Sequence, residues 1–383
     1  MIGRDISNKV RHLATKFPVV TLTGVRQSGK STLLKNMFPE YRYVSLEDLD
    51  FRKFASEDAR GFLASMGDRA IIDEVQRVPD LFSYIQGRVD ATNQEGVYIL
   101  SGSSNFLLME SISQSLAGRA AVLKMTPFSI HELAASGQEL SIDNYLYTGS
   151  FPRIYDKNIA AADYYPSYIE TYVERDVRML KNITNTSSFM RFIRLCAGRI
   201  GQLLNVTSLA NECGISVATA QSWLSVLESS YIIYLLKPYY RNYNKRLVKS
   251  PKLYFCDTGL ASALLGMESP DQMTLHFMRG EIFENMVINE CIKNAYNNGK
   301  EPNIYFWRDS NNNEVDLLIE KGMSLLAVEI KSGATVNSSW KDALVKFGSI
   351  AGIPALNMKV IYGGDTNLLH NDVLFQSWKE MSF

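Results

Sequence analysis

The segment VVTLTGVRQSGKSTLLKNMF, residues 19–38, constrains the fold of this chain more than any other. Its β-branched start predicts a strand, and a helical pattern begins about ten residues later. Between strand and helix lies the GxxxxGKS spacing of a phosphate loop. The residues that carry it are Gly24, Gly29, Lys30, Ser31 and Thr32. The segment therefore predicts an α/β fold class, with a parallel-sheet P-loop domain that binds a nucleotide.

Each residue type in this loop has a physical task. Glycine backbone geometry lets amide N–H groups face a β-phosphate. Lys30 neutralises charge on the β- and γ-phosphates, and the Ser31 hydroxyl reaches Mg²⁺. The sequence thus predicts ATP and Mg²⁺ as cofactors.

A second apolar run, Ala70–Ile72, ends in Asp73 and Glu74. Continuous apolarity predicts a central parallel strand, and ligands bind at the carboxyl ends of such strands. We expect Asp73 to hold Mg²⁺ through water and Glu74 to polarise the attacking water. The alternative is that the two acids cap a helix N-terminus.

Polar residues end the next predicted strand, GVYILSGSS, between the two nucleotide motifs. Ser103, Ser104 and Asn105 are candidates for orienting the water or sensing the γ-phosphate, although a helix-capping role fits Ser104 or Asn105 as well. Arg175, in the amphipathic helices that follow, is a second sensor candidate, with a surface ion pair as the alternative.

The middle of the chain predicts a helical lid followed by a winged helix. Residues 205–228 have the anatomy of a helix-turn-helix, and the strands of the wing would be YIIYLLKPYY and KLYFCD. The candidate recognition helix lacks lysine and arginine, which disfavours base reading in the major groove.

The predicted wing segment, residues 237–252, is strongly basic and contains Tyr239, Tyr240 and Tyr243. Clustered cations release counterions from phosphates, and tyrosines stack on bases, so the segment predicts DNA as a partner, recognised by shape or backbone. The alternative is a solvated loop. The candidate DNA-binding residues are Arg241, Tyr243, Lys245, Arg246, Lys249 and Lys252.

The segment NIYFWRDSNNNEVDLLIEKGMSLLAVEIKSG reads as three strands with turns at Asn311–Asn313 and Gly322. Alternation places Glu314 with Asp316 on one face, and Glu329 with Lys331 on one face. Glu284, on the preceding predicted helix, is expected to complete this polar group.

The chain as a whole resembles a widespread prokaryotic group of AAA-type ATPases that carry a C-terminal restriction-endonuclease-like domain. The matching segments are TGVRQSGKSTLL, IIDEVQ, SLAGR, YVERDV, FCDTGL, GEIFEN, WRDSNNNEVD and VEIKSG. For the first domain the resemblance implies that Arg119, just before a fifth strand, acts in trans as an arginine finger in a homo-oligomer, a ring or a partial ring. The alternative is that Gly118 and Arg119 only cap a helix.

For the last domain the resemblance is to the D…(E/D)xK nuclease signature. It implies that Asp316 and Glu329 bind Mg²⁺ and that Lys331 orients the attacking water, with Glu284 upstream. Domains of this fold also serve as DNA-binding or scaffold modules, so the signature leaves cleavage open.

Length and composition set the remaining expectations. A chain of 383 residues predicts several domains, which we place at 1–130, 131–260 and 261–383. Forty basic residues balance forty acidic ones, so a polyanion site must come from local clustering. Four scattered cysteines and the lack of a long apolar run indicate a cytoplasmic protein without a membrane partner.

Together these features predict an ATPase that binds DNA, branched or broken DNA included, through its winged-helix and nuclease-like domains. One alternative is an ATP-regulated, Mg²⁺-dependent DNA nuclease. The other is a nucleotide-operated signalling or assembly switch without nucleic acid, which the neutral net charge would suit.

Overall fold

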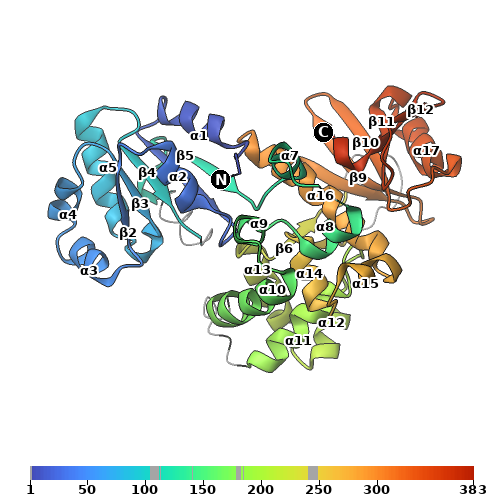
Figure 1. The fold of residues 1–383 in the computed structure, drawn as a ribbon, viewed down its shortest axis with the longest axis horizontal. Coiled ribbons are helices and arrows are strands. Elements are labelled where there is room, and N and C mark those ends of the chain that lie inside the picture. Colours follow the sequence, from blue (N-terminus) through green and yellow to red (C-terminus); the bar gives the residue numbers. More distant parts are fainter. Residues whose placement is uncertain are drawn as a thin grey trace.

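The computed structural model describes residues 2–103, 112, 114–139, 141–177, 183, 185–239 and 249–383, except for the side chains of residues 174–176. Three regions follow one another along the chain (Figure 1). The N-terminal and C-terminal regions lie on opposite sides of the view, and the middle region lies below and between them.

The N-terminal region is a parallel sheet covered by helices on both faces. Its five strands have the spatial order β2-β3-β4-β1-β5. The strands are β1 (Val19–Gly24), β2 (Arg42–Ser45), β3 (Ala70–Asp73), β4 (Tyr98–Ser101) and β5 (Ala120–Met125). The helices are α1 (Ser7–Ala14), α2 (Lys30–Met37), α3 (Leu49–Glu57), α4 (Ala59–Ser65) and α5 (Leu81–Thr92).

The central strands explain the apolar runs of the sequence. In β3, Ile71 packs into the core on one face of the sheet and Ile72 into the core on the other. Because β3 lies between β2 and β4, both faces need apolar residues. The predicted central parallel strand is confirmed, and it brings Asp73 to the same edge as the end of β1.

The middle region is mostly helical. Its helices are α7 (Ile130–Ala135), α8 (Ile142–Thr148), α9 (Pro152–Lys157), α10 (Ala161–Tyr168), a π-helical segment (Ile169–Val177), α11 (Thr186–Ala197), α12 (Val206–Cys213), α13 (Val217–Ser229), α14 (Thr258–Leu264) and α15 (Pro270–Leu275). Strands β6 (Ile233–Leu236) and β7 (Lys252–Phe255) form an antiparallel pair. Since α14 and α15 pack on α8, this region extends past residue 260.

The helix pair α12–α13 has the local chemistry expected of a helix-turn-helix. Gly214 turns the chain with a φ of 67°, a conformation that glycine adopts without strain. The Ser216 hydroxyl then caps α13 by accepting a hydrogen bond from the backbone N–H of Thr219, at 3.0 Å. The predicted pair of helices and the two strands after it are present; their assignment as a winged helix remains a prediction.

The C-terminal region is a six-stranded mixed sheet of order β12-β13-β11-β10-β9-β8 with two helices. The elements are α16 (Arg279–Asn297), β8 (Ile304–Arg308), β9 (Glu314–Lys321), β10 (Ser324–Lys331), α17 (Asp342–Ala351), β11 (Met358–Tyr362), β12 (Leu368–His370) and β13 (Val373–Ser377). The three predicted strands are β8, β9 and β10, and they form an antiparallel meander. A separate α/β domain is therefore present, and its nuclease-like identity remains a prediction.

Helix α16 connects all three regions. It packs against β5 of the first region, against α8 and α14 of the second, and against β10 of the third. Apolar residues on it, such as Ile282 and Phe283, are buried, but so are Glu290 and Lys293. A helix buried on several sides needs partners for its polar side chains, and the contacts described below supply them.

Candidate functional site

The phosphate loop runs from the end of β1 to the start of α2. Gly24 has a φ of 135°, and a Cβ atom there would lie 2.0 Å from the backbone oxygen of Met125. Gly29, with a φ of 92°, directly precedes α2. Both positions therefore require glycine, as the motif predicts.

Lys30 is almost completely buried beneath this loop. Its Nζ donates hydrogen bonds to the backbone oxygens of Gly24 at 3.1 Å and Val25 at 2.8 Å. Burial lowers the pKa of Lys30 to about 8, although the charges of Glu74 and Asp73 raise it. Neutral carbonyl groups thus hold an ammonium group whose preferred partner would be an anion.

Asp73 lies at the centre of a hydroxyl cluster. Its Oδ2 accepts hydrogen bonds from Ser31 at 2.6 Å and Tyr43 at 2.8 Å, and its Oδ1 accepts one from Ser101 at 2.5 Å. Ser31 and Asp73 are the residues predicted to hold Mg²⁺, and their oxygen atoms are the ligand type that this ion prefers. The site therefore fits a magnesium ion whose other ligands are phosphate oxygens and water.

Glu74, the predicted general base, follows Asp73 in a left-handed conformation with a φ of 52°. One carboxylate oxygen, Oε2, accepts hydrogen bonds from Gln76 at 2.5 Å and from the Ser103 hydroxyl at 3.2 Å. Ser103, just after the end of β4, thus lies beside Glu74, just after the end of β3. The other two sensor candidates, Ser104 and Asn105, lie outside the described residues.

A cleft of about 440 Å³ opens over the loop and contains Lys30, Ser31, Glu74 and Ser103. Sequence reasoning missed several of the residues that line it. They are Arg4 near the N-terminus, and Arg153, Asp156 and Lys157 on α9. The three residues on α9 are identified only because α9 packs beside the phosphate loop in space. No phosphate-loop sequence motif includes that segment.

Arg4 supports the phosphate loop from behind. Its guanidinium group donates to the backbone oxygens of Ser28 at 2.7 Å and Thr126 at 2.6 Å, and pairs with Glu132 at 3.1 Å. Because the Arg4 and Glu132 side chains are both buried, the pair is little screened by solvent. Arg4 therefore ties the loop to the chain that follows β5.

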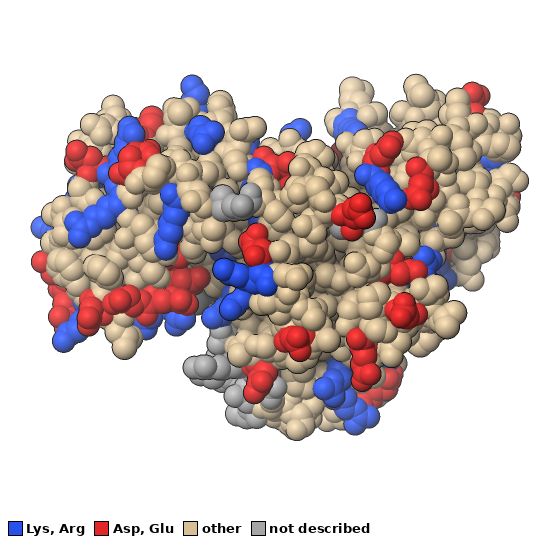
Figure 2. Space-filling view, viewed as in Figure 1, with Lys and Arg blue, Asp and Glu red and all other residues tan. Residues whose placement is uncertain are grey.

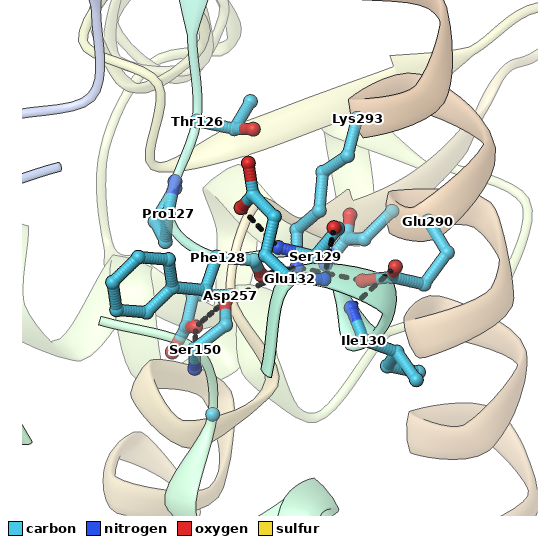
Figure 3. A network of polar contacts seen from close by, with 12 residues as sticks. Thr126, Pro127, Phe128, Ser129, Ile130, Glu132, Ser150, Asp257, Glu290 and Lys293 are labelled. Carbon is cyan, nitrogen blue, oxygen red and sulfur yellow. Dashed lines mark hydrogen bonds and ion pairs between the residues drawn. The ribbon is translucent and has the colours of Figure 1, made fainter. Parts of the chain in front are cut away.

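A buried polar network continues from this point to α16 (Figure 3). The backbone N–H of Ile130 donates to Glu290 at 2.9 Å. Lys293 donates to the backbone oxygen of Phe128 at 2.8 Å, to Ser150 at 3.1 Å and to Glu290 at 2.8 Å. Hydrogen-bonded side chains thus connect the nucleotide cleft with the helix that borders the C-terminal sheet.

Arg119 lies at the edge of the sheet opposite the phosphate loop. Its backbone oxygen accepts a hydrogen bond from the N–H of Val19, the first residue of β1. Gly24, at the start of the phosphate loop, is five residues further along this strand. At about 3.3 Å per residue, it lies roughly 16 Å from Val19. The side chain pairs with Asp90 at 2.5 and 2.9 Å and donates to the Ala117 carbonyl at 3.2 Å. Arg119 is thus far from its own nucleotide cleft. The side chain of Arg175 is not among those described.

The basic segment divides into exposed and buried parts. Lys237 and Lys249 are exposed. Lys252 is only 2% exposed and pairs with Glu284 and Glu314, which corrects its predicted place on a DNA-binding surface. The other candidates lie outside the described residues: Arg241, Tyr243, Lys245 and Arg246. Tyr239 is also unsuited to stacking on bases, because it is buried in the C-terminal core.

The C-terminal candidates lie on three neighbouring elements. Glu329 pairs with Lys331 at 2.6 Å on β10, and Asp316 on β9 accepts a hydrogen bond from the Ile330 N–H at 2.8 Å. Burial raises the pKa of Glu329 to about 8, with a further increase from Asp316. Burial also raises the pKa of Glu284 to about 7, against the opposing charge of Lys252.

The two candidate metal sites differ in how well they fit an ion. At the phosphate loop, nucleotide oxygens would complete the ligands of Mg²⁺. The C-terminal domain offers Asp316, already engaged by a backbone N–H, and Glu329, already engaged by Lys331. Within the described part of the chain, no three His, Cys, Asp or Glu side chains form a group that could hold a metal. The C-terminal residues therefore do not fit the divalent cation that the resemblance implies.

Three family models match consecutive parts of the chain. Residues 16–134 match an AAA domain, residues 139–271 a domain of unknown function (DUF8612), and residues 279–380 another (DUF4143). With the parallel sheet and the phosphate loop, the first match supports a P-loop ATPase of the AAA type. Among the described residues, no helix has the length and apolarity needed to cross a bilayer.

Similar proteins occur in bacteria and archaea. An uncharacterised protein of Mycobacterium tuberculosis is 28% identical over 94% of this chain and 80% of its own length. One from Methanocaldococcus jannaschii is 24% identical over 83% of this chain and 75% of its own. A Walker-type ATPase of Pyrococcus abyssi aligns with 69% of this chain and 96% of its own, with 14% identity and a TM-score of 0.44.

Proposed function

We propose that the protein hydrolyses ATP in the cleft above the phosphate loop and couples hydrolysis to binding of DNA. One observation carries the first half. Lys30, Ser31 and Glu74, from two separate sequence motifs, line a single cleft, with Asp73 bonded to Ser31. Phosphoryl transfer requires a phosphate-binding cation, metal ligands and a general base in one place. Here Lys30 is the cation, Ser31 and Asp73 are the metal ligands, and Glu74 is the base.

The residues of the cleft have separable tasks. When nucleotide binds, Lys30 exchanges the carbonyls of Gly24 and Val25 for phosphate oxygens and so gains an anionic partner. Mg²⁺, when bound by Ser31 and Asp73, neutralises charge on the phosphates. Glu74, held by Gln76 and Ser103, orients the attacking water and accepts its proton.

Arg119 supports assembly into a homo-oligomer. The roughly 16 Å that separate it from its own loop exceed the length of an arginine side chain. Arg119 would therefore contact the nucleotide of a neighbouring subunit, once its ion pair with Asp90 is broken. The Asp90 pair is exposed, so breaking it costs little.

The DNA half of the proposal rests on the basic segment around Lys237 and Lys249. The face seen in Figure 2 shows Lys and Arg mixed with Asp and Glu, and acids gather along the lower edge of the N-terminal region. Among the acids of this region, Glu47, Asp48 and Asp50 at the start of α3 are exposed. That edge would repel a polyanion, so the DNA contact is proposed at the basic segment and not there.

The test is the ATPase rate with no DNA and with single-stranded, duplex or four-way-junction DNA. We expect Mg²⁺-dependent turnover that DNA stimulates. Glu74→Gln should lower kcat by about 10²–10⁴-fold and retain nucleotide binding. Replacing Arg241, Lys245 and Arg246 by alanine should remove stimulation and leave basal turnover unchanged.

The outcomes separate the candidate functions. No turnover in the wild type would overturn the ATPase assignment. Turnover without salt-dependent DNA binding would favour a nucleotide-operated switch. Cleavage of plasmid or forked DNA with Mg²⁺ or Mn²⁺, lost in Asp316→Ala, would favour an ATP-regulated nuclease.

A further inference from the structure

Lys252 connects the middle and C-terminal regions through buried charge. It begins β7, yet its Nζ lies 3.0 Å from Oε1 of Glu284 on α16 and also contacts Oε1 of Glu314 on β9. With 2% exposure it is among the most buried charged residues described. A buried ammonium persists only where anions compensate the loss of hydration, and here two carboxylates do so.

The two carboxylates are engaged on other sides as well. Glu284 accepts a further hydrogen bond from the Tyr254 hydroxyl, also on β7. Glu314 pairs with Arg308 on β8 at 3.1 Å. These bonds therefore join β7 of the middle region to α16, β8 and β9 of the C-terminal region.

The remaining acids have internal partners too. Asp316 accepts from the Ile330 N–H, and Lys331 pairs with Oε1 of Glu329. Oε2 of Glu329 is buried without a hydrogen-bond partner among the described atoms. We name these residues the acid cluster: Glu284, Glu314, Asp316 and Glu329, with the cations Lys252, Arg308 and Lys331.

We propose that Lys252 is the counter-cation of the acid cluster, in the role that the nuclease resemblance would give to a divalent metal ion. Four acids face three fixed cations, so the cluster is close to neutral without an external ion. Because Lys252 belongs to β7, the ion pair fastens the middle region to the C-terminal sheet. In this arrangement the C-terminal domain is a scaffold and not a metal-dependent nuclease.

The experiment measures Mn²⁺ binding to the nucleotide-free chain by electron paramagnetic resonance, with thermal unfolding in parallel. We expect no Mn²⁺ binding that depends on Asp316, so wild type and Asp316→Asn should titrate alike. Lys252→Met removes the internal cation. Mn²⁺ should then raise its Tm by several degrees and leave the Tm of the wild type unchanged.

Lys293→Met is the matched control. Lys293 is also buried and ion-paired, with Glu290 at 2.8 Å, but it lies outside the acid cluster. Mn²⁺ should not raise the Tm of this variant. If Lys252→Met alone fails to fold, Lys252→Gln removes the same charge but keeps an N–H donor for the carboxylates, and it allows the same measurement.

Two results would overturn the proposal. One is Mn²⁺ binding to the wild type that Asp316→Asn abolishes, because the cluster would then hold a metal with Lys252 in place. The other is a folded Lys252 variant that Mn²⁺ does not stabilise, because the lysine would then not stand in for a cation. Neither result bears on the phosphate loop, so ATP hydrolysis is tested separately.

Discussion

Two buried lysines, Lys30 and Lys252, serve opposite purposes in the same chain. Lys30 donates to the carbonyl oxygens of Gly24 and Val25, which carry no net charge. Lys252 pairs with the carboxylates of Glu284 and Glu314. The pKa values follow the partners: burial lowers that of Lys30 to about 8, whereas the acids raise that of Lys252 despite its burial.

The difference shows how one residue type builds either a binding site or a fixed contact. For a buried lysine held by neutral groups the charged form is disfavoured, and such a lysine gains most when an anion binds. A lysine that already has two carboxylates has little to gain from a further ligand, and its removal would leave those carboxylates buried without a cation. Burial alone therefore does not identify a functional lysine; the charge of its partners does.

The largest expected effect is on stability. Lys252→Met leaves two buried carboxylates without their cation and should lower the free energy of unfolding by about 3–5 kcal/mol. Lys30→Met removes a poorly compensated buried charge and should leave the stability unchanged or slightly higher. Urea unfolding at pH 7 without nucleotide, followed by far-UV circular dichroism, measures both.

Tryptophan fluorescence sharpens this test, because all four tryptophans lie after residue 220. The transition seen by fluorescence should shift in Lys252→Met and remain in place in Lys30→Met. Equal losses of stability in the two variants would contradict the distinction between the lysines.

The second effect concerns pH and nucleotide affinity. Phosphates pair with the protonated form of Lys30, whose pKa burial lowers to about 8. Below that pH the charge is already present, whereas above it binding must take up a proton. The affinity for ADP should therefore fall as the pH rises above 8, by up to about tenfold per pH unit.

Calorimetry in buffers of different ionisation enthalpy measures this proton uptake directly. We expect uptake to increase from little at pH 7 towards one proton at pH 9. Lys30→Arg keeps its charge throughout and is the control, with no such uptake. An ADP affinity for the wild type that stays flat between pH 7.5 and 9.5 would rule out the lowered pKa.

The sequence predicts the phosphate loop, the central strands and the β8–β10 meander because each depends on local patterns. Strand periodicity, glycine positions and turn residues act over a few neighbouring residues, so Gly24 and Gly29 reveal their roles in the printed sequence. The edge at which β3 ends follows from the parallel topology, and that edge brings Asp73 to Ser31.

Long-range pairing is what the sequence could not reveal. Arg4 finds Glu132 at a separation of 128 residues, and Lys252 finds Glu284 at a separation of 32. In the sequence Lys252 belongs to a basic run, and a basic run is normally solvated. Only the packing of β7 against α16 turns one member of that run into a buried counter-cation, while Lys249 remains exposed.

The smallest expected effect is the loss of stability on removing Arg308, one of the two cations that pair with Glu314. Glu314 pairs with buried Lys252 and with Arg308, whose side chain is 29% exposed. Arg308→Met should lower the free energy of unfolding by only about 0.2–1 kcal/mol, because solvent screens an accessible pair. Raising the salt from 0.05 to 1 M should remove most of that loss and little of the loss in Lys252→Met. A salt-independent loss of several kcal/mol in Arg308→Met would mean that Arg308, and not Lys252, carries the charge balance of the acid cluster.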